Sequence, residues 1–234
     1  MAGAKQPGLR GADRRVPLEA IVADFCLESR CHGARVLDLG PGHFEFAEIA
    51  QQAGARDVIG VDNDPAVVRL GELRGLKTYE MDIRELSADA LGGKVDGIFC
   101  RLSLNAVWFG SAWEAHDDWA RRLSSLLTPG GWAWLAPWNY KKDGADFNQT
   151  AEAIRLQIAT LQRRGFLTFR LLPDPARYYG LTGHQEPARE TVIVRNLEVP
   201  LPVKRGVIGR IDRTGCAAEF AWSPGGAASL AGQG

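Results

Sequence analysis

VLDLGPGH, at residues 36–43, joins a short apolar run to a segment with helical periodicity. Arg35–Leu39 has the pattern of a buried strand, and apolar side chains then recur at helical spacing until Gly54, which is placed to end the helix. Gly40 and Gly42 allow a close approach of the backbone to a ligand, and a helix N-terminus favours electron-rich groups. The stretch therefore predicts a ligand-binding turn between a strand and a helix.

Further apolar runs along the chain alternate with helical patterns. Strands are expected at Asp57–Val61, Lys77–Met81, Val95–Leu102, Trp132–Ala136, Phe166–Leu171 and Glu190–Leu197, and helices at Pro17–Arg30, from Asp64-Pro65 to about Arg74, at Arg84–Leu91, Trp113–Leu127 and Ala151–Arg164. This alternation predicts an α/β fold, a doubly wound and mostly parallel sheet with helices on both faces. Residues 1–15 are expected to be disordered, 16–200 to form a single domain with a short N-terminal helical cover, and 201–234 to be an irregular to disordered tail.

Two acidic residues follow the next strands of this pattern. Asp62 ends the second strand, where a carboxylate can accept hydrogen bonds from both hydroxyls of a ribose, and Asp82 ends the third, where it can accept from an adenine amino group. With the turn at residues 40–43 they describe a nucleoside-binding crevice; the competing interpretation is an ordinary sheet whose acids cap helices. A nicotinamide site would need the spacing Gly-x-Gly-x-x-Gly, whose last position is Glu45 here.

Residues 36–138 resemble a class I S-adenosylmethionine-dependent methyltransferase. VLDLGPGH resembles the first motif of that family, GVDND its ribose-binding acid, EMDIRE its adenine-contact segment, VDGIFCRLSLNAV its fourth-strand motif and LLTPGGWAWLAPW its fifth-strand motif. The resemblance implies a seven-stranded sheet with an antiparallel last strand, and S-adenosylmethionine as the cofactor. The cofactor-binding residues that it implies are Asp38, Gly40, Gly42, His43, Asp62, Asn63, Asp82, the backbone of Ile83, and Arg101.

The first motif departs from the family at Phe44, which stands where a third glycine is usual, and a bulky ring there would reshape the floor beneath the methionine part. The fourth-strand motif matches no subfamily signature. His116, beside two aspartates, and Arg101 are the candidate catalytic residues. Aromatic side chains near strand ends are candidates to wall a substrate pocket: Trp108, Trp113, Trp138 and Tyr140.

Composition narrows the function. Lys and Arg number 28 and Asp and Glu 28, for a net charge of zero, so neither nucleic acid nor a membrane is expected as a partner. The four cysteines have no zinc-site spacing, so we expect no metal and four reduced thiols, and without an apolar leader or span we expect a cytoplasmic protein. The prediction is a methyltransferase that acts on a small molecule, with a homodimer or a partner subunit left open as the protein partner.

Two alternatives stay open at this point. One is an enzyme of the same fold that uses the sulfonium charge for an elimination or cyclisation without transferring methyl. The other is a non-catalytic partner subunit that has kept the fold. The substrate and the methylated atom are not encoded in any motif.

Overall fold

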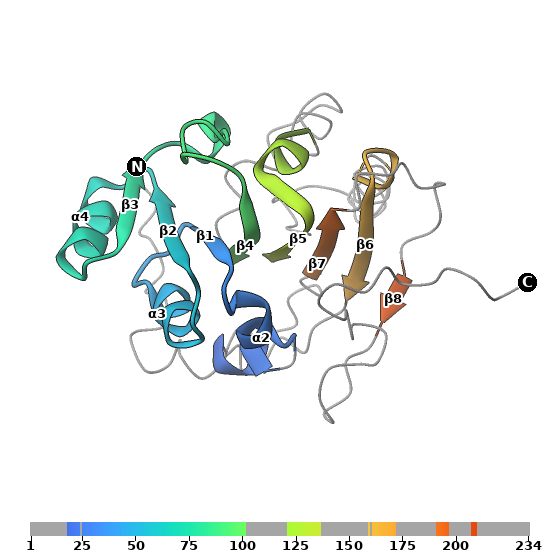
Figure 1. Cartoon of the computed structure of the whole chain (residues 1–234), viewed down its shortest axis with the longest axis horizontal. Helices are drawn as coiled ribbons and strands as arrows, with labels where there is room; N and C mark the ends of the chain where they lie inside the picture. The colour runs from blue at the N-terminus through green and yellow to red at the C-terminus, as the bar shows by residue number, and fades with distance from the viewer. Residues whose placement is uncertain are drawn as a thin grey trace, which may run out of the picture.

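The computed structural model describes residues 18–23, 25–101, 121–136, 159, 161–171, 191–196 and 207–209. These residues form one eight-stranded sheet in the order β3-β2-β1-β4-β5-β7-β6-β8 (Figure 1). The strands are β1 (Arg35–Leu39), β2 (Asp57–Asp62), β3 (Lys77–Glu80), β4 (Val95–Arg101), β5 (Leu127–Ala136), β6 (Phe166–Leu171), β7 (Thr191–Asn196) and β8 (Val207–Gly209). The helices are α2 (Leu27–Cys31), α3 (Glu45–Gln52), α4 (Pro65–Leu73) and the 3-10 turn η1 (Ile83–Glu85), and residues 18–23 and 121–126 are also helical.

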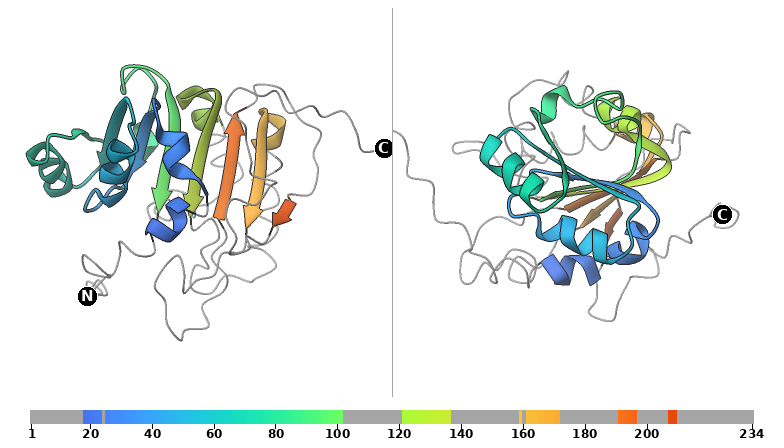
Figure 2. Two further views of the ribbon diagram at one scale, coloured as in Figure 1. Left: turned by 60° about the horizontal axis from the view of Figure 1, so that its bottom comes forward. Right: turned by 60° about the vertical axis from the view of Figure 1, so that its left-hand side comes forward.

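The first five strands are parallel to one another, as expected for a doubly wound sheet. The strand order reverses between β1 and β4, which are hydrogen-bonded neighbours although β2 and β3 separate them in the sequence. Helices lie on both sides of the sheet, with α2 and α3 on one side and the helical residues 121–126 on the other (Figure 2). In such sheets ligands bind outside the carboxyl ends of the strands, at the point where the order reverses.

The two faces of the sheet bury different side chains. The face beneath α2 and α3 is aromatic: the rings of Phe46 and Phe99 stack at 3.9 Å between centroids, those of Phe99 and Trp134 at 4.9 Å, and Phe25 meets Trp134 edge-on at 5.8 Å. The opposite face is mostly aliphatic and includes Leu37, Ile98 and Leu135. Because both faces are covered, all five residues of β1 are buried, which explains the unbroken apolar run around Asp38.

Local sequence signals mark the start of α4 and the end of α3. Asp64 caps α4, with its carboxylate accepting from the Ala66 N–H at 2.9 Å, and Pro65 follows in the first turn. Gly54 follows the end of α3 with a φ of 83°, a conformation that glycine adopts without strain. Both termini agree with the sequence prediction.

The N-terminal helix differs from prediction. A single helix was expected over Pro17–Arg30, but Cys26 has a φ of 52° and separates the helical residues 18–23 from α2. The break allows Phe25 and Leu27, which are 3% and 2% exposed, both to face the core. Cys31 and Cys100 are buried free thiols, whereas Cys26 is disulfide-bonded, so the expectation of four reduced cysteines is wrong for Cys26. Cysteine spacing along a chain does not report which sulfur atoms approach each other in space.

Three other element predictions were inexact. Residues 84–91 were expected to be a helix, but only the turn Ile83–Glu85 is helical, in 3-10 form. β5 begins at Leu127 rather than at Trp132, because Leu127 already pairs with Val95; the register then shifts, so that Gly97 pairs with Trp132. β7 is antiparallel to β5 and β6. Seven strands were expected, whereas the described residues form eight, because β8 lies within the predicted tail and pairs parallel to β6. A three-residue strand is too short to show a period in the sequence.

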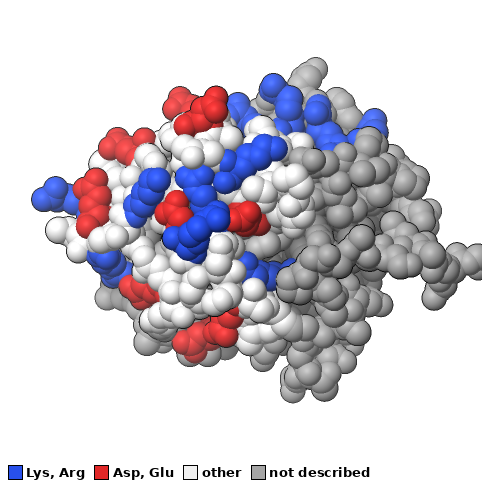
Figure 3. Space-filling view, viewed as in Figure 1, with Lys and Arg blue, Asp and Glu red and all other residues white. Residues whose placement is uncertain are grey.

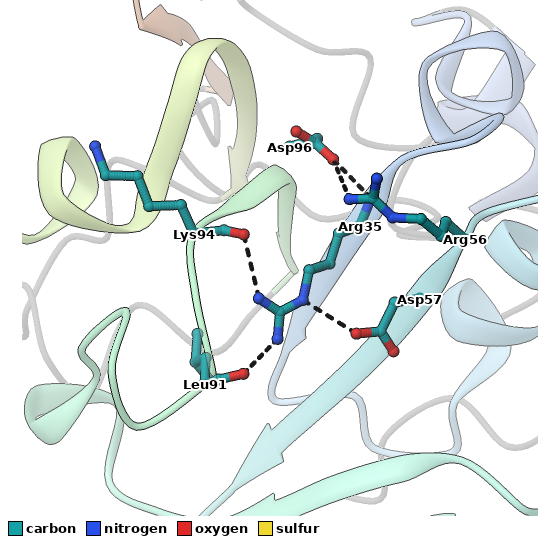
Figure 4. A network of polar contacts seen from close by, with 6 residues as sticks. All are labelled: Arg35, Arg56, Asp57, Leu91, Lys94 and Asp96. Carbon is teal, nitrogen blue, oxygen red and sulfur yellow. Dashed lines mark hydrogen bonds and ion pairs between the residues drawn. The ribbon is translucent and has the colours of Figure 1, made fainter.

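A buried arginine ties the amino ends of three strands together (Figure 4). The Arg35 guanidinium donates to the Asp57 carboxylate at 3.0 Å, to the Lys94 carbonyl at 3.2 Å and to the Leu91 carbonyl. Asp96 accepts from the Arg35 backbone N–H at 2.9 Å. This network lies at the edge of the sheet opposite to the carboxyl ends. None of the described helices has the length and apolar character needed to cross a bilayer.

Candidate functional site

The predicted turn lies at the carboxyl end of β1 and has three residues with left-handed backbone. Gly40, Gly42 and Phe44 have φ values of 63°, 57° and 63°. The Gly40 N–H donates to the Val61 carbonyl at 2.9 Å, and the Phe44 N–H donates to the Pro41 carbonyl at 2.9 Å, so the turn is anchored to β2 and closed on itself. A Cβ built at Gly42 would meet no atom within 4 Å. The backbone of this turn therefore faces open space that a ligand can occupy.

Asp38 is the buried acid of the site. It is 3% exposed, and its Oδ2 atom has no hydrogen-bond partner among the residues that the structure describes. Burial raises the pKa of the Asp38 carboxyl to about 8; the Arg101 guanidinium acts in the opposite direction. The charges of Glu45 and Asp62 raise this pKa further, and a backbone hydrogen bond from Ala47 lowers it. A buried carboxyl oxygen without a hydrogen bond destabilises the folded protein, so Asp38 is suited to bind a cationic hydrogen-bond donor supplied by a ligand.

These electrostatic couplings show which predicted residues the fold brings together. Asp38 and Arg101 come from the adjacent strands β1 and β4, and Asp62 ends β2 on the other side of β1. One Asp62 oxygen accepts from the Asp64 backbone N–H at 3.0 Å. A carboxylate offers about four acceptor positions, so this bond leaves capacity for the hydroxyls of a ribose.

Asp82 has a partner that the adenine interpretation did not include. Its two oxygens accept from the Arg84 Nε at 2.9 and 3.0 Å, and one also accepts from the Arg84 backbone N–H at 2.8 Å, which caps η1. These hydrogen bonds hold the pKa of Asp82 at about 2. Asp82 is therefore a fixed carboxylate next to Ile83, with part of its acceptor capacity already used by Arg84.

Phe44 does not occupy the floor of the turn. It is fully buried, and its ring lies against Gly60 of β2 and Gly71 of α4, in the aromatic core. The sequence predicts that the ring reshapes the floor beneath the methionine part; in the structure the ring lies against Gly60 and Gly71 and not within 4 Å of a Cβ built at Gly42. The left-handed φ explains why glycine is usual at this position.

Two contacts to the turn were missed from the sequence. Arg74, which follows α4, donates from Nη1 to the His43 carbonyl at 2.6 Å and to the Glu48 carboxylate at 2.8 Å. Glu45, treated only as a failed glycine position, contributes to the electrostatics of Asp38. No spacing in the sequence marks the two Arg74 contacts, because they join segments 31 and 26 residues apart. The remaining candidates lie outside the described residues: His116, Trp108, Trp113, Trp138 and Tyr140.

A family model described as a methyltransferase domain matches residues 12–168 of this chain. The chain belongs to the methyltransferase domain family. The resemblance to class I S-adenosylmethionine-dependent methyltransferases is thereby confirmed, and the matched range includes β1 to β5 and the turn between β1 and α3. No curated protein sequence matches this methyltransferase significantly.

Solved structures share the fold of this methyltransferase at low sequence identity. An S-adenosylmethionine-dependent methyltransferase from Mesorhizobium loti is 16% identical, with a TM-score of 0.53 over 74% of this chain and 95% of the other. A protein from Listeria monocytogenes, described as a methyltransferase of the same kind, is 15% identical, with a TM-score of 0.55 over 80% and 99%. The plantazolicin methyltransferase BpumL, solved with S-adenosylhomocysteine, is 15% identical, with a TM-score of 0.53 over 79% and 86%. These likenesses establish the architecture.

Proposed function

We propose that this methyltransferase binds S-adenosylmethionine at the carboxyl ends of β1, β2 and β4 and methylates a small molecule. The observation that carries the proposal is Asp38, whose buried Oδ2 has no hydrogen-bond partner in the described part of the chain and which lies within electrostatic range of Arg101. A carboxyl group and a guanidinium on adjacent strands are complementary to the ammonium and carboxylate of an amino acid, because the charge of a bound ammonium favours the ionised form of the carboxyl. The methionine part of the cofactor carries both groups.

The chain supplies the following contacts to the cofactor. Asp38 accepts from the ammonium group, Arg101 donates to the carboxylate, and the turn at Gly40, Gly42 and His43 lets the backbone approach the methionine part. Asp62 accepts from the ribose hydroxyls. The contacts proposed for the adenine are Asn63 at its face and Asp82 with the Ile83 backbone at its edge.

Bound S-adenosylmethionine supplies a methyl group on a positively charged sulfur. The protein has to orient the acceptor atom in line with that carbon and exclude water, and orientation alone contributes about 7–11 kcal/mol in favourable cases. A general base is required only if the acceptor carries a proton at neutral pH, and His116 is proposed for that role. Trp108, Trp113, Trp138 and Tyr140 are proposed to line the acceptor pocket.

The charge distribution supports a small acceptor over a nucleic acid. The whole chain has 28 basic and 28 acidic residues, and on the face in Figure 3 the two signs are interspersed over the described part. A protein that tracks a phosphate backbone needs a continuous basic surface instead.

Calorimetry with S-adenosylmethionine and S-adenosylhomocysteine tests the cofactor site, on the wild type and on Asp62→Ala. Micromolar binding by the wild type and loss of at least tenfold in the variant are expected; absence of binding to folded wild type would overturn the proposal. Asp64→Ala is the matched control, because Asp64 caps α4 without belonging to the proposed contacts. The substrate class is tested by following S-adenosylhomocysteine release with small-molecule extracts, RNA and protein; methyl incorporation into RNA or protein alone contradicts a small acceptor.

A further inference from the structure

The ring of Phe44 occupies a slot that exists because Gly60 and Gly71 have no side chains. Its ring lies between β2 and α4: a Cβ at Gly60 would be 2.7 Å from the ring Cε1, and a Cβ at Gly71 would be 2.6 Å from Cζ. Real Cβ atoms do not approach other atoms this closely, so the ring excludes a side chain at Gly60, and the ring together with the Thr78 methyl excludes one at Gly71. This packing attaches Phe44, the last residue of the turn at residues 40–44, to α4, the helix that follows Asp62.

A second contact joins the same helix to the same turn. Arg74, directly after α4, donates from one nitrogen to the His43 carbonyl at 2.6 Å and to the Glu48 carboxylate at 2.8 Å. His43 belongs to the turn, and Glu48 belongs to the first turns of α3. The arginine therefore fixes the turn to α3 and to the C-terminal end of α4 at once.

The two contacts act on a strained stretch of backbone. Phe44 has a φ of 63°, which is unfavourable for a residue with a side chain, so the conformation has to be held by its surroundings. The ring on one side and the Arg74 bond to the preceding carbonyl on the other are such constraints. A site held by a loop needs supporting contacts of this kind to keep its geometry.

We propose that Phe44 and Arg74 are positioning residues that clamp the turn at residues 40–44 onto α4 and so orient its backbone toward the methionine part of the cofactor. This inference rests on the proposed function. Where the family usually has a flexible glycine, the packed Phe44 ring holds this end of the turn in place. Since Asp62, Asn63 and Asp64 lead directly into α4, the clamp holds the methionine-binding and ribose-binding parts of the site in one arrangement.

Two ligands separate positioning from general stability. S-adenosylhomocysteine contains the amino acid end, whereas 5′-methylthioadenosine contains the same nucleoside without it. Arg74→Ala is expected to weaken S-adenosylhomocysteine binding about three- to tenfold, in the range for losing a charged hydrogen bond, and to leave methylthioadenosine binding within twofold. Arg74→Lys, which keeps one of the two hydrogen bonds, is expected to recover part of the loss. Arg69→Ala is the matched control, because Arg69 is an exposed arginine on the same helix.

The outcomes separate this inference from the proposed function. If the wild type binds both ligands and Arg74→Ala weakens the binding of both equally, or of neither, the proposed clamp is wrong. The proposed cofactor site is not affected by that result. If the folded wild type binds neither ligand, the proposed function and the clamp are both overturned. Phe44→Leu provides a second variant that keeps an apolar side chain in the slot. It is expected to show the same selective loss, and equal binding of both ligands at wild-type strength would argue against Phe44 as a positioning residue.

Discussion

The ring of Phe44 lies where the side chain of any residue larger than glycine at position 60 would lie. A Cβ at Gly60 would be 2.7 Å from the ring, while its next neighbours, in Thr78 and Pro41, would be at 3.3 and 3.4 Å. Gly60 on β2 has no side chain, and the Phe44 ring fills the space that a side chain there would take. Neither residue is explained by its own position in the sequence.

We predict that the effects of substitutions at Gly60 and Phe44 are strongly coupled. Gly60→Ala alone is expected to destabilise the protein by about 1–3 kcal/mol through overpacking against the ring. In a Phe44→Gly background the same substitution should cost little, because the remaining contacts, at 3.3 and 3.4 Å, require only small shifts. Urea unfolding of the wild type, the two single variants and the double variant measures the coupling. Additive effects would show that the ring is not what excludes a side chain at position 60.

The titration of Asp38 predicts how the stability of the cofactor-free protein depends on pH. Its pKa is raised from 3.8 to about 8 in the folded protein. The folded state therefore holds a proton that the unfolded state has already released, and the stabilisation that is complete below pH 4 is lost as pH rises toward 8. The contribution is at most about 1.4 kcal/mol per pH unit.

The measurement is the free energy of unfolding at pH 5, 6, 7 and 8 for the wild type and Asp38→Asn. The wild type is expected to lose stability relative to the variant across this range. Glu45→Gln serves as a control that removes one neighbouring charge and leaves Asp38 in place; it should lower the pKa of Asp38 and shift the loss to lower pH. A constant difference between wild type and Asp38→Asn would contradict a raised pKa.

We predict that Arg35 stabilises the fold and has no role in cofactor binding. Arg35→Ala removes the donor that serves the Leu91 and Lys94 carbonyls and the Asp57 carboxylate, and the loss of hydrogen bonds to partly buried groups costs about 1–3 kcal/mol. Arg56, whose side chain is 67% exposed in its pair with Asp96, provides the control, and Arg56→Ala should change stability by less than about 1 kcal/mol. Both variants should bind S-adenosylhomocysteine normally below their unfolding temperatures. Weakened binding by folded Arg35→Ala would place the network in contact with the site.

The pair between Asp82 and Arg84 yields a test of adenine recognition. Asp82→Ser keeps an oxygen to cap η1 but removes the carboxylate proposed to accept from the adenine amino group. We expect it to weaken S-adenosylhomocysteine binding severalfold and to leave binding of the inosine analogue, which lacks that amino group, unchanged. Calorimetry with both ligands measures the difference, with Arg84→Ala as the control that breaks the pair and retains the carboxylate. Equal losses for the two ligands would remove Asp82 from the adenine contacts.

The geometry of the candidate turn and of the α4 cap could be predicted because their signals are local. A turn with Gly40 and Gly42, the acids Asp62 and Asp82 at or after the ends of β2 and β3, and a cap with Asp64 and Pro65 all depend on residues within a few positions of one another. Parallel strands then bring their carboxyl ends to one edge whatever the details of packing. The helix expected over residues 17–30 failed for the opposite reason, since its break at Cys26 serves contacts with Trp134, more than 100 positions away.

Periodicity, turn residues and caps act within single elements, so the sequence was enough to predict the alternation of strands and helices, the family, and the edge of the sheet where the candidate residues gather. Three features become visible only in the folded chain: Phe44 packs into the core, Arg74 reaches the turn, and one Asp38 oxygen has no hydrogen-bond partner among the described residues. Each of these is a relation between segments that the chain keeps apart. Distances of that kind are set by how the layers pack, and packing depends on every side chain in the interface at once.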